Sequence, residues 1–282
     1  MPELPEVEIT ARLLDRALTG AIVESALAPG INALRTFDPP LSALERRELL
    51  GVGRRGKQFI VSFAGELALL VHLMSSGRLQ LFERRAGPRD RTSRLLVRFA
   101  DGRELRLREF GTKQAAWVKL LSADALAHDE GLLALGPEAW PAPPGDLGER
   151  LAVPRPLHAL LRDQHVLAGI GRSWVDEILW RARISPFKRG EDLAPDELAA
   201  LAAAIAQALG GAIDHYERTL ELPIPDRLPM PLAVHRHAGQ PCPRCGATLA
   251  LVSFEDYELT YCPDCQTAGR VLKDRRLSRL LK

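Results

Sequence analysis

Four cysteines constrain the fold of this chain more strongly than any other sequence feature. Cys242, Cys245, Cys262 and Cys265 are the only cysteines among the 282 residues, and their spacing is C-x2-C-x16-C-x2-C. Each C-x2-C pair can form a tight turn that offers two thiolates to one tetrahedral ion, and the intervening residues can form a β-hairpin. Four sulfur ligands with no open position describe a structural zinc site. A pair of redox C-x-x-C motifs is the alternative, but the spacing favours a small module that holds one structural Zn²⁺.

The distribution of cysteine also indicates a cellular compartment. A secreted protein stabilised by disulfides rarely confines its cysteines to one short segment, whereas all four cysteines here lie after residue 240. The cysteine-free remainder suits a reducing cytoplasm. The first residues contain no apolar leader, and no apolar run approaches the roughly 20 residues of a membrane span. We therefore expect a cytoplasmic protein that does not contact a membrane.

Positive charge is concentrated in two segments of a nearly neutral chain. The formal net charge is +2, yet residues 84–108 contain nine arginines against three carboxylates. Residues 270–282 contain six basic residues against one aspartate. Local basic patches of this kind suit a surface that binds a polyanion. A solvated arginine-rich surface explains the same pattern, and the composition leaves both interpretations open.

The first half of the chain predicts a helix followed by antiparallel strands. Pro5 suits the first turn of a helix that runs to residue 18, because its missing N–H would have no partner there. Apolar runs typical of strands follow at residues 58–63, 66–74, 77–82 and 115–121. Residues 94–110 alternate apolar and polar side chains around Asp101-Gly102, which predicts a hairpin with a two-residue turn. We expect a β layer or sandwich with the helix packed against it.

The second half of the chain is helical. Residues 135–156 contain six prolines and little periodicity, which predicts a linker. Helices are expected at residues 156–167, 173–184 and 196–220, followed by a proline-rich loop at 220–232 and then by the cysteine module. The resulting class is multidomain α+β. The predicted domains are residues 1–134, 135–234 and 235–282.

Two glycine-containing segments suit contact with phosphates. The segment DQHVLAGIGRSW places Gly169 and Gly171 between two predicted helices, where backbone N–H groups at the start of the second helix can face a phosphate. The segment GVGRRGK lacks Walker-A spacing but sets Arg54, Arg55 and Lys57 beside glycines that let a phosphate chain approach. A generic helix hairpin and an exposed basic turn explain the same two segments.

Several of these segments occur together in a known order. MPELPEVE, GRRGK, LGPE, DQxxLAGIG and GQPCPRCG follow one another along almost the whole chain. In this combination the sequence resembles the formamidopyrimidine-DNA glycosylase/endonuclease VIII family. The resemblance implies an N-terminal antiparallel β-sandwich with an N-terminal helix, a helix–two-turn–helix domain and a zinc-finger β-hairpin. It further implies a monomeric, bifunctional DNA glycosylase and abasic-site (AP) lyase of base excision repair. That enzyme would act on double-stranded DNA with damaged bases or abasic sites, and would associate with the nucleoid in the bacterial cytoplasm.

The resemblance also implies how the chemistry proceeds. Removal of Met1 would expose Pro2 as a secondary amine, which is a strong nucleophile once deprotonated. Attack at C1′ of the damaged nucleotide expels the base and leaves a positively charged iminium that acidifies C2′, so β-elimination of the 3′ phosphate follows. Glu3 is implied as the general acid/base and Glu6 as its support. Lys57 would bind the phosphate or help to protonate the departing base.

The same resemblance implies residues that hold the DNA. Turning a nucleotide out of the duplex costs a few kcal/mol and leaves a gap in the stack. Arg108 would face the orphaned base and Phe110 would insert into the stack. A surface charge and a core phenylalanine are the alternatives, but the position of both residues at the end of an alternating strand, beside Gly111, favours a loop tip. The implied DNA-binding residues are Arg54, Arg55, His72, Met74, Arg108, Phe110, Gly169, Gly171, Arg172, Tyr257 and Arg270.

Three positions depart from the family pattern. Arg172 stands where the family usually has asparagine, and Tyr257 stands where the zinc finger usually has arginine. The methionine after His72 is either shifted to Met74 or lost, with Ser75 in its place. None of these changes touches the implied catalytic residues. They leave the preferred lesion open, and Arg172 and Tyr257 motivate an alternative, a damage-binding protein of the same fold with little or no turnover. A regulatory zinc-ribbon protein is a third possibility, but it has no use for a free proline amine.

Overall fold

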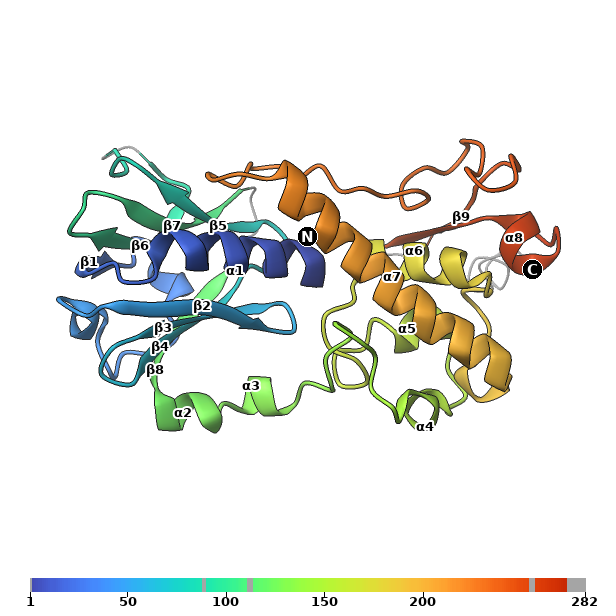
Figure 1. The fold of residues 1–282 in the computed structure, drawn as a ribbon, viewed down its shortest axis with the longest axis horizontal. Coiled ribbons are helices and arrows are strands. Elements are labelled where there is room, and N and C mark those ends of the chain that lie inside the picture. The colour runs from blue at the N-terminus through green and yellow to red at the C-terminus, as the bar shows by residue number, and fades with distance from the viewer. Residues whose placement is uncertain (1, 88–89, 111–113, 254–256, 273–282) are drawn as a thin grey trace, which may run out of the picture. The chain divides into compact units, whose positions relative to one another are not determined.

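The computed structural model describes residues 2–87, 90–110, 114–253 and 257–272 (Figure 1). Met1 and most of the predicted basic tail lie outside the described residues. The chain divides into two compact units, described separately below. The first comprises residues 1–134 and 213–229, and the second comprises residues 135–212 and 230–282.

The first unit begins with helix α1 (Leu4–Leu18). Its start follows from the sequence, because Pro5 lies in the first turn and Glu3 caps the helix. The apolar residues Val7, Leu14 and Leu18 are fully buried in one hydrophobic core with strand residues, and α1 packs against β2 and β3. The predicted N-terminal helix and its packing against a β layer are confirmed.

Two antiparallel sheets form the rest of this core (Figure 1). One has the order β1 (Val23–Leu27), β6 (Ser93–Phe99), β7 (Glu104–Glu109), β5 (Gly77–Phe82). The other has the order β2 (Leu49–Arg55), β3 (Gln58–Phe63), β4 (Leu67–His72), β8 (Trp117–Ser122). Buried side chains from both sheets belong to a single core, so the predicted β-sandwich is confirmed. The strands β1 and β2 were not predicted. The short helices α2 (Ala123–Ala127) and α3 (Glu130–Leu133) follow β8.

The β6–β7 hairpin differs in detail from its prediction. The Phe99 N–H donates to the Arg103 carbonyl over 2.9 Å, which leaves three residues, Ala100 to Gly102, in the connection. Gly102 has a φ of +94°, as the last residue of a three-residue hairpin loop requires. The Asp101 carboxylate also accepts a hydrogen bond from the Arg103 N–H. The predicted hairpin is therefore correct, but the two-residue turn is wrong.

Many arginines of the segment 84–108 are paired inside the first unit. Arg98 and Arg106 both contact the fully buried Glu104. Burial alone would raise the pKa of Glu104, but hydrogen bonds from Arg98, from the Ala86 N–H and from Arg106 outweigh it and lower the pKa. Arg103 contacts Asp101 in the same way. The arginine-rich sequence thus serves largely to neutralise local carboxylates.

The second unit contains short helices, one long helix and a β-hairpin. Its elements are α4 (Leu147–Leu151), α5 (Leu157–Leu160), α6 (Arg172–Ala182), the first part of α7 (Pro195–Thr219), β9 (Ala250–Ser253), β10 (Glu258–Tyr261) and α8 (Pro263–Thr267). Strands β9 and β10 pair antiparallel between the two cysteine pairs. The predicted zinc-finger hairpin is confirmed.

Two predictions for this unit are wrong. The supposed linker, residues 135–156, is packed: Leu147 and Leu151 of α4 are buried, and Glu138 forms a β-bridge with Ala168. The helix expected at 156–167 is reduced to α5. It ends early because the chain turns at Asp163, whose carboxylate accepts the His165 N–H over 3.1 Å and competes with helical pairing.

Helix α7 is long and apolar enough to cross a membrane by length and composition, contrary to the expectation that no such run exists. It is the one such helix among the described residues. A single helix of this kind is weak evidence, because a core helix of a soluble protein has the same properties. The buried residues of α7 recur every three or four positions, as they do in a helix with one buried face. They include Leu201, Ile205, Ala208, Leu209, Ala212, Ile213 and Tyr216.

Candidate active site, DNA contacts and metal centre

The start of α1 brings Pro2, Glu3 and Glu6 together. Glu3 and Glu6 form a capping box, in which each side chain accepts a hydrogen bond from the backbone N–H of the other. The Glu3 N–H donates to Glu6 Oε2 over 2.9 Å. Pro2 is buried, and Glu3 and Glu6 are only 1% and 2% exposed. Two carboxylates are thus held within one helical turn of the imino acid, in surroundings that contain little water.

A residue that the sequence did not single out completes this cluster. The Tyr216 hydroxyl, from the last turns of α7, donates a hydrogen bond to Glu6 Oε1 over 2.8 Å. Both oxygens of the Glu6 carboxylate therefore have a donor, one from the backbone of Glu3 and one from Tyr216. Tyr216 is fully buried. Burial, followed by the negative charge of Glu6 and the hydrogen bond to it, raises the pKa of Tyr216 well above its usual range, so the phenol stays protonated.

Lys57 lies at the end of the sheet that carries His72. It occupies the turn between β2 and β3, and the following residue, Gln58, pairs with His72 in the ladder. The ring of His72 stacks on Trp117, with 5.5 Å between their centroids. Burial, followed by the positive charges of Lys57 and Arg35, lowers the pKa of His72 to about 4. His72 is therefore neutral at pH 7, and the charge at this edge comes from its basic neighbours.

Met74 follows directly after the strand that ends at His72. Its φ of 50° lies in the left-handed region, which non-glycine residues rarely occupy. The Met74 N–H donates to His72 Nδ1 over 2.9 Å. A neutral imidazole that accepts at Nδ1 carries its proton on Nε2, so His72 has a donor to offer.

Arg54 and Arg55 differ in their surroundings. Arg54 Nε lies 2.7 Å from Glu8 Oε2, and its side chain is only 7% exposed. Glu8 also accepts from Arg12 Nε over 2.7 Å, so it holds Arg54 against α1. Arg55, the next residue, is half-buried at the end of β2. The structure therefore gives Arg54 an internal ion pair, which does not favour the predicted contact with a phosphate.

Arg108 lies within β7 and not at the predicted loop tip. Its Nη1 atom is 3.1 Å from both Gln80 Oε1 and Asp226 Oδ1, and its guanidinium lies 4.7 Å from the centre of the Phe110 ring. Gln80 is buried and also donates to Asp226 Oδ1 over 3.0 Å. Gln80 and Asp226 thus hold Arg108 beside Phe110. Gly111, predicted to belong to the same loop, lies outside the described residues.

The glycine turn before α6 is stabilised by a glutamine of the same motif. Gln164 Nε2 donates to the Ile170 carbonyl over 2.8 Å, and Gln164 Oε1 accepts from the Gly169 N–H over 3.0 Å. Gly169 has a φ of +109°, which explains the glycine, and Gly171 is the N-cap residue of α6. The turn therefore presents the backbone at the start of α6, where Arg172 is the first helical residue.

The two unusual positions, Arg172 and Tyr257, lie together in the second unit. The Arg172 guanidinium is 5.4 Å from the centre of the Tyr257 ring, and the Arg162 guanidinium is 4.1 Å from it. The His158 ring stacks on Tyr257, with 5.7 Å between centroids. Both guanidinium groups lie within the roughly 6 Å at which an aromatic ring attracts a cation. Arg270, the remaining predicted DNA contact, is exposed after α8.

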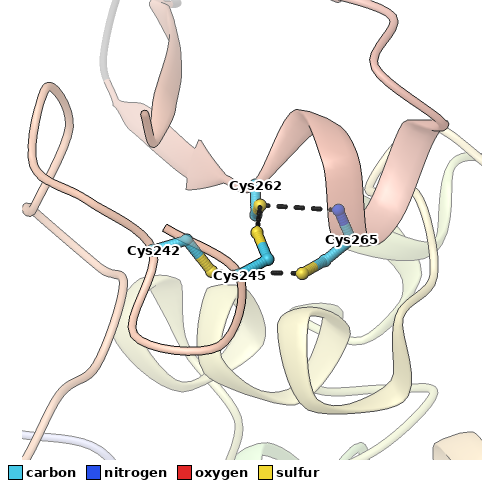
Figure 2. A group of neighbouring side chains, drawn as sticks. All are labelled: Cys242, Cys245, Cys262 and Cys265. Carbon is cyan, nitrogen blue, oxygen red and sulfur yellow. Dashed lines mark hydrogen bonds between the residues drawn. The ribbon is translucent and has the colours of Figure 1, made fainter. Parts of the chain in front are cut away.

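The four cysteines converge on one point (Figure 2). Their sulfur atoms all lie within 4.8 Å of one another, and none forms a disulfide. Four thiolates around a zinc ion at about 2.3 Å have sulfur atoms roughly 3.8 Å apart, so the cluster fits this ion. Burial opposes ionisation of Cys242, but hydrogen bonds from Arg244 and Cys245 N–H groups and from the Trp180 indole lower its pKa to about 6. These residues hold one structural zinc, as predicted.

Comparison with known proteins gives a consistent family assignment. Residues 1–112 match the model of the formamidopyrimidine-DNA glycosylase N-terminal domain, residues 146–223 match its H2TH domain, and residues 239–268 match the zinc finger found in FPG and IleRS. The chain is 35% identical to a formamidopyrimidine-DNA glycosylase of Roseiflexus sp., over 94% of this chain and 100% of the relative. The chain belongs to the formamidopyrimidine-DNA glycosylase family. The assignment confirms the predicted class of enzyme, a DNA glycosylase with AP lyase activity in base excision repair.

Solved structures of this family have the same fold. A Lactococcus lactis Fpg in complex with DNA that contains an abasic site superimposes with a TM-score of 0.82 at 26% identity. A MutM complex with DNA that contains carbocyclic 8-oxo-G superimposes with a TM-score of 0.83 at 27% identity. Both alignments cover 94% of this chain and 100% of the other. The predicted fold class is confirmed over nearly the whole chain.

The sequence did not identify Tyr216, Gln80, Asp226 or Arg162 as part of a site in this member of the glycosylase family. Each contacts a predicted site residue that is distant in sequence, as Tyr216 contacts Glu6 across 210 positions. None of them belongs to a motif that identified a site residue, although Arg162 directly precedes the DQHVLAGIG segment. Asp226 follows Pro225 in a proline-rich loop, but such proximity to a turn is too common to identify a functional residue.

Proposed function

We propose that Pro2, once Met1 has been removed, is the nucleophile of a bifunctional glycosylase that excises oxidised bases and cleaves abasic sites in double-stranded DNA. The observation that carries this proposal is the buried capping box, which holds Glu3 and Glu6 next to Pro2 at the start of α1. A secondary amine with a carboxyl group beside it has both components of covalent base excision, a nucleophile and a general acid/base.

The proposed reaction proceeds through a covalent iminium. The Pro2 nitrogen attacks C1′, the glycosidic C1′–N bond breaks, and the base leaves with a proton. Glu3 protonates the ring oxygen O4′, so that the sugar opens and the Pro2 nitrogen forms a C=N⁺ bond with C1′. The iminium withdraws electrons from C2′, a proton leaves C2′, and the bond to the 3′ phosphate breaks. Water then hydrolyses the iminium and regenerates the amine.

Glu6 and Lys57 have supporting roles in this proposal. Glu6 accepts the Glu3 N–H and thereby fixes the peptide that joins Pro2 to Glu3. Lys57 lies close enough to His72 to lower its pKa, so this edge of the sheet is positively charged. A positive edge suits binding of the phosphate that flanks the lesion.

The proposed DNA contacts belong to both units of the chain. Arg55, His72, Met74, Arg108 and Phe110 belong to the first unit, which carries the nucleophile. The backbone from Gly169 to Gly171 supplies N–H groups for a phosphate in the second unit, and Arg172, Tyr257 and Arg270 are proposed to add charge and stacking there. Arg54 is proposed to act indirectly, because Glu8 holds it against α1. The zinc ion held by the four cysteines links the two ends of the finger and takes no part in the chemistry.

The proposed functional domains are residues 1–134 for catalysis, 135–234 for the helix–two-turn–helix and 235–282 for the zinc finger. The relatives are bacterial proteins that act on DNA. We propose that this chain likewise works as a monomer in the bacterial cytoplasm, associated with the nucleoid through DNA.

Covalent trapping tests the proposal. Borohydride reduces an iminium to a stable amine, so a duplex with one abasic site is expected to give an adduct of one chain with one cleaved strand. Intact mass must first establish that Met1 is absent. The Pro2→Gly variant leaves a primary amine with a less constrained backbone and is expected to lose most of the adduct, whereas Glu149→Gln, an exposed change in the second unit, is expected to trap as the wild type does.

The results also separate the proposal from its alternative. Tight binding of abasic DNA by protein that lacks Met1, without adduct or strand cleavage, would identify a damage-binding protein. A panel of duplexes with one oxidised purine or one oxidised pyrimidine then measures which lesion is released fastest.

A further inference from the structure

We propose that Tyr216 is a positioning residue of the active site: its phenol holds the Glu6 carboxylate, and Glu6 in turn holds the peptide between Pro2 and Glu3. This inference rests on the proposed function, because it presumes that Pro2 is the nucleophile. It adds the end of α7 to a site that otherwise belongs to the start of α1.

The geometry forms a continuous chain of hydrogen bonds. The Tyr216 hydroxyl donates to Glu6 Oε1 over 2.8 Å, and Glu6 Oε2 accepts from the Glu3 N–H over 2.9 Å. That N–H belongs to the peptide bond that follows Pro2. With one donor on each oxygen, the carboxylate cannot rotate without breaking a bond, and the peptide beside the Pro2 ring is fixed by the same contact.

Burial makes this chain of bonds effective. Tyr216 is fully buried and Glu6 is 2% exposed, so water does not compete for the phenol or for the carboxylate. A hydrogen bond to a charged acceptor in such surroundings is stronger than one between neutral groups. Because the pKa of Tyr216 is raised by burial and by Glu6, the phenol remains a donor throughout the working pH range.

A separate contact holds the end of α7 near α1, independently of Tyr216. Glu217 lies 2.5 Å from Arg16 Nη1 and 3.6 Å from Arg12 Nη1. These ion pairs are largely exposed, and Glu217 is the immediate neighbour of Tyr216 in α7. Glu217 therefore provides a matched control: Glu217→Gln weakens the contact between α7 and α1 without removing the donor to Glu6.

The test compares the rate of adduct formation with the affinity for DNA. In Tyr216→Phe the ring still fills its place, but the donor is lost. The rate of borohydride-trapped adduct formation at saturating abasic duplex is expected to fall roughly 10-fold or more, since one hydrogen bond to a charged group is removed. The dissociation constant is expected to stay within about twofold, because Tyr216 is fully buried and its hydroxyl contacts Glu6. Glu217→Gln is expected to change neither value.

Restoring a donor distinguishes positioning from packing. Replacement of Tyr216 by 4-aminophenylalanine places an N–H group where the hydroxyl was and is expected to recover most of the rate. Wild-type trapping with an unchanged rate in Tyr216→Phe would overturn the inference and leave the proposed function intact. Equal losses in Tyr216→Phe and Glu217→Gln would also overturn it, since they would assign both residues to anchoring α7. Failure of the wild type itself to trap, in protein that lacks Met1, would overturn both proposals.

Discussion

Replacement of Glu177 is expected to destabilise the segment of the second unit that leads into the zinc finger. Glu177 is fully buried on α6, and its Oε1 atom accepts three backbone N–H groups. The donors are Ala233 at 3.0 Å, Val234 at 2.8 Å and His235 at 2.9 Å. The Val234 side chain packs in one small core with Trp180, Cys242, Leu249 and Cys262. One carboxylate oxygen therefore fixes the segment that leads into the cysteine cluster.

The expected magnitude follows from these three bonds. An unsatisfied buried N–H costs about 1–3 kcal/mol, so Glu177→Ala is expected to destabilise the second unit by roughly 3–9 kcal/mol. Glu177→Gln keeps an oxygen acceptor but loses its charge, which lowers each bond by about 1 kcal/mol and the total by about 3 kcal/mol. Oε2 of Glu177 has no hydrogen-bond partner in the part of the chain that the structure describes, so the new amide gains no acceptor there. Whole domains are stable by only about 5–15 kcal/mol, so the alanine variant approaches unfolding.

Two measurements check this ordering. Urea unfolding of the zinc-loaded protein reports the loss of stability, and transfer of zinc to a coloured chelator reports the finger itself. Zinc release is expected to be fastest in Glu177→Ala, intermediate in Glu177→Gln and slowest in the wild type. The exposed Glu149→Ala serves as the control and is expected to change stability by less than about 0.5 kcal/mol. An alanine variant within about 1 kcal/mol of the wild type would refute the reasoning, because each unsatisfied N–H alone should cost that much.

Three further predictions concern the metal, the pH dependence and the DNA contact. Metal analysis is expected to find one zinc per chain, and Cys262→Ser is expected to lose the metal together with DNA affinity. The pKa of His72 in the folded protein is about 4, below its ordinary value of 6.5. The unfolded chain therefore takes up a proton at a higher pH than the folded chain does. Stability falls as the pH drops from 6.5 to about 4. Between pH 7 and 5 the wild type is expected to lose about 2 kcal/mol more than His72→Gln, as measured by urea unfolding at each pH. Asp226→Asn releases Arg108 from a half-exposed ion pair and is expected to tighten binding of abasic DNA up to about fivefold. Fluorescence anisotropy measures this, with Asp101→Asn as the control, and unchanged affinity would contradict the proposed role of Arg108.

The strands illustrate what the sequence could predict and what it could not. Strand β5 was predicted at its observed bounds because its residues form a short apolar run typical of a strand. Strand β1 was missed because VESAL has no strong alternation and is a strand only by pairing with β6 about seventy residues later. The hairpin loop was misjudged by one residue because Asp-Gly occurs in both two- and three-residue connections. Local pattern determines the type of an element, whereas pairing depends on the rest of the chain.

The residues of the candidate site likewise divide into those that local sequence predicts and those that only the fold brings together. Pro2, Glu3 and Glu6 lie in one short motif, so their proximity follows from the local chain. The same holds for the two cysteines within each C-x2-C pair. The partners that orient predicted residues lie far away in sequence. In addition, a residue that the sequence suggests is available to bind DNA can be paired with another residue in the fold. Arg54 illustrates the second case, because its sequence neighbours suggest a phosphate site whereas its side chain is paired with Glu8.

Two of the three departures from the family pattern, Arg172 and Tyr257, lie together in a way that favours an enzyme over a damage-binding protein with little turnover. In the sequence they look like independent changes, an added charge at Arg172 and a lost charge at Tyr257. In the structure the Arg172 guanidinium lies 5.4 Å from the Tyr257 ring, and Arg162 adds a second cation at 4.1 Å. The positive charge missing from position 257 is therefore present on the same ring, supplied by neighbouring residues of the second unit. A local exchange of this kind preserves attraction for a phosphate while changing its geometry. It alters neither Pro2 nor the capping box, which belong to the other unit, so we propose that it changes how DNA is held and leaves the covalent chemistry unchanged.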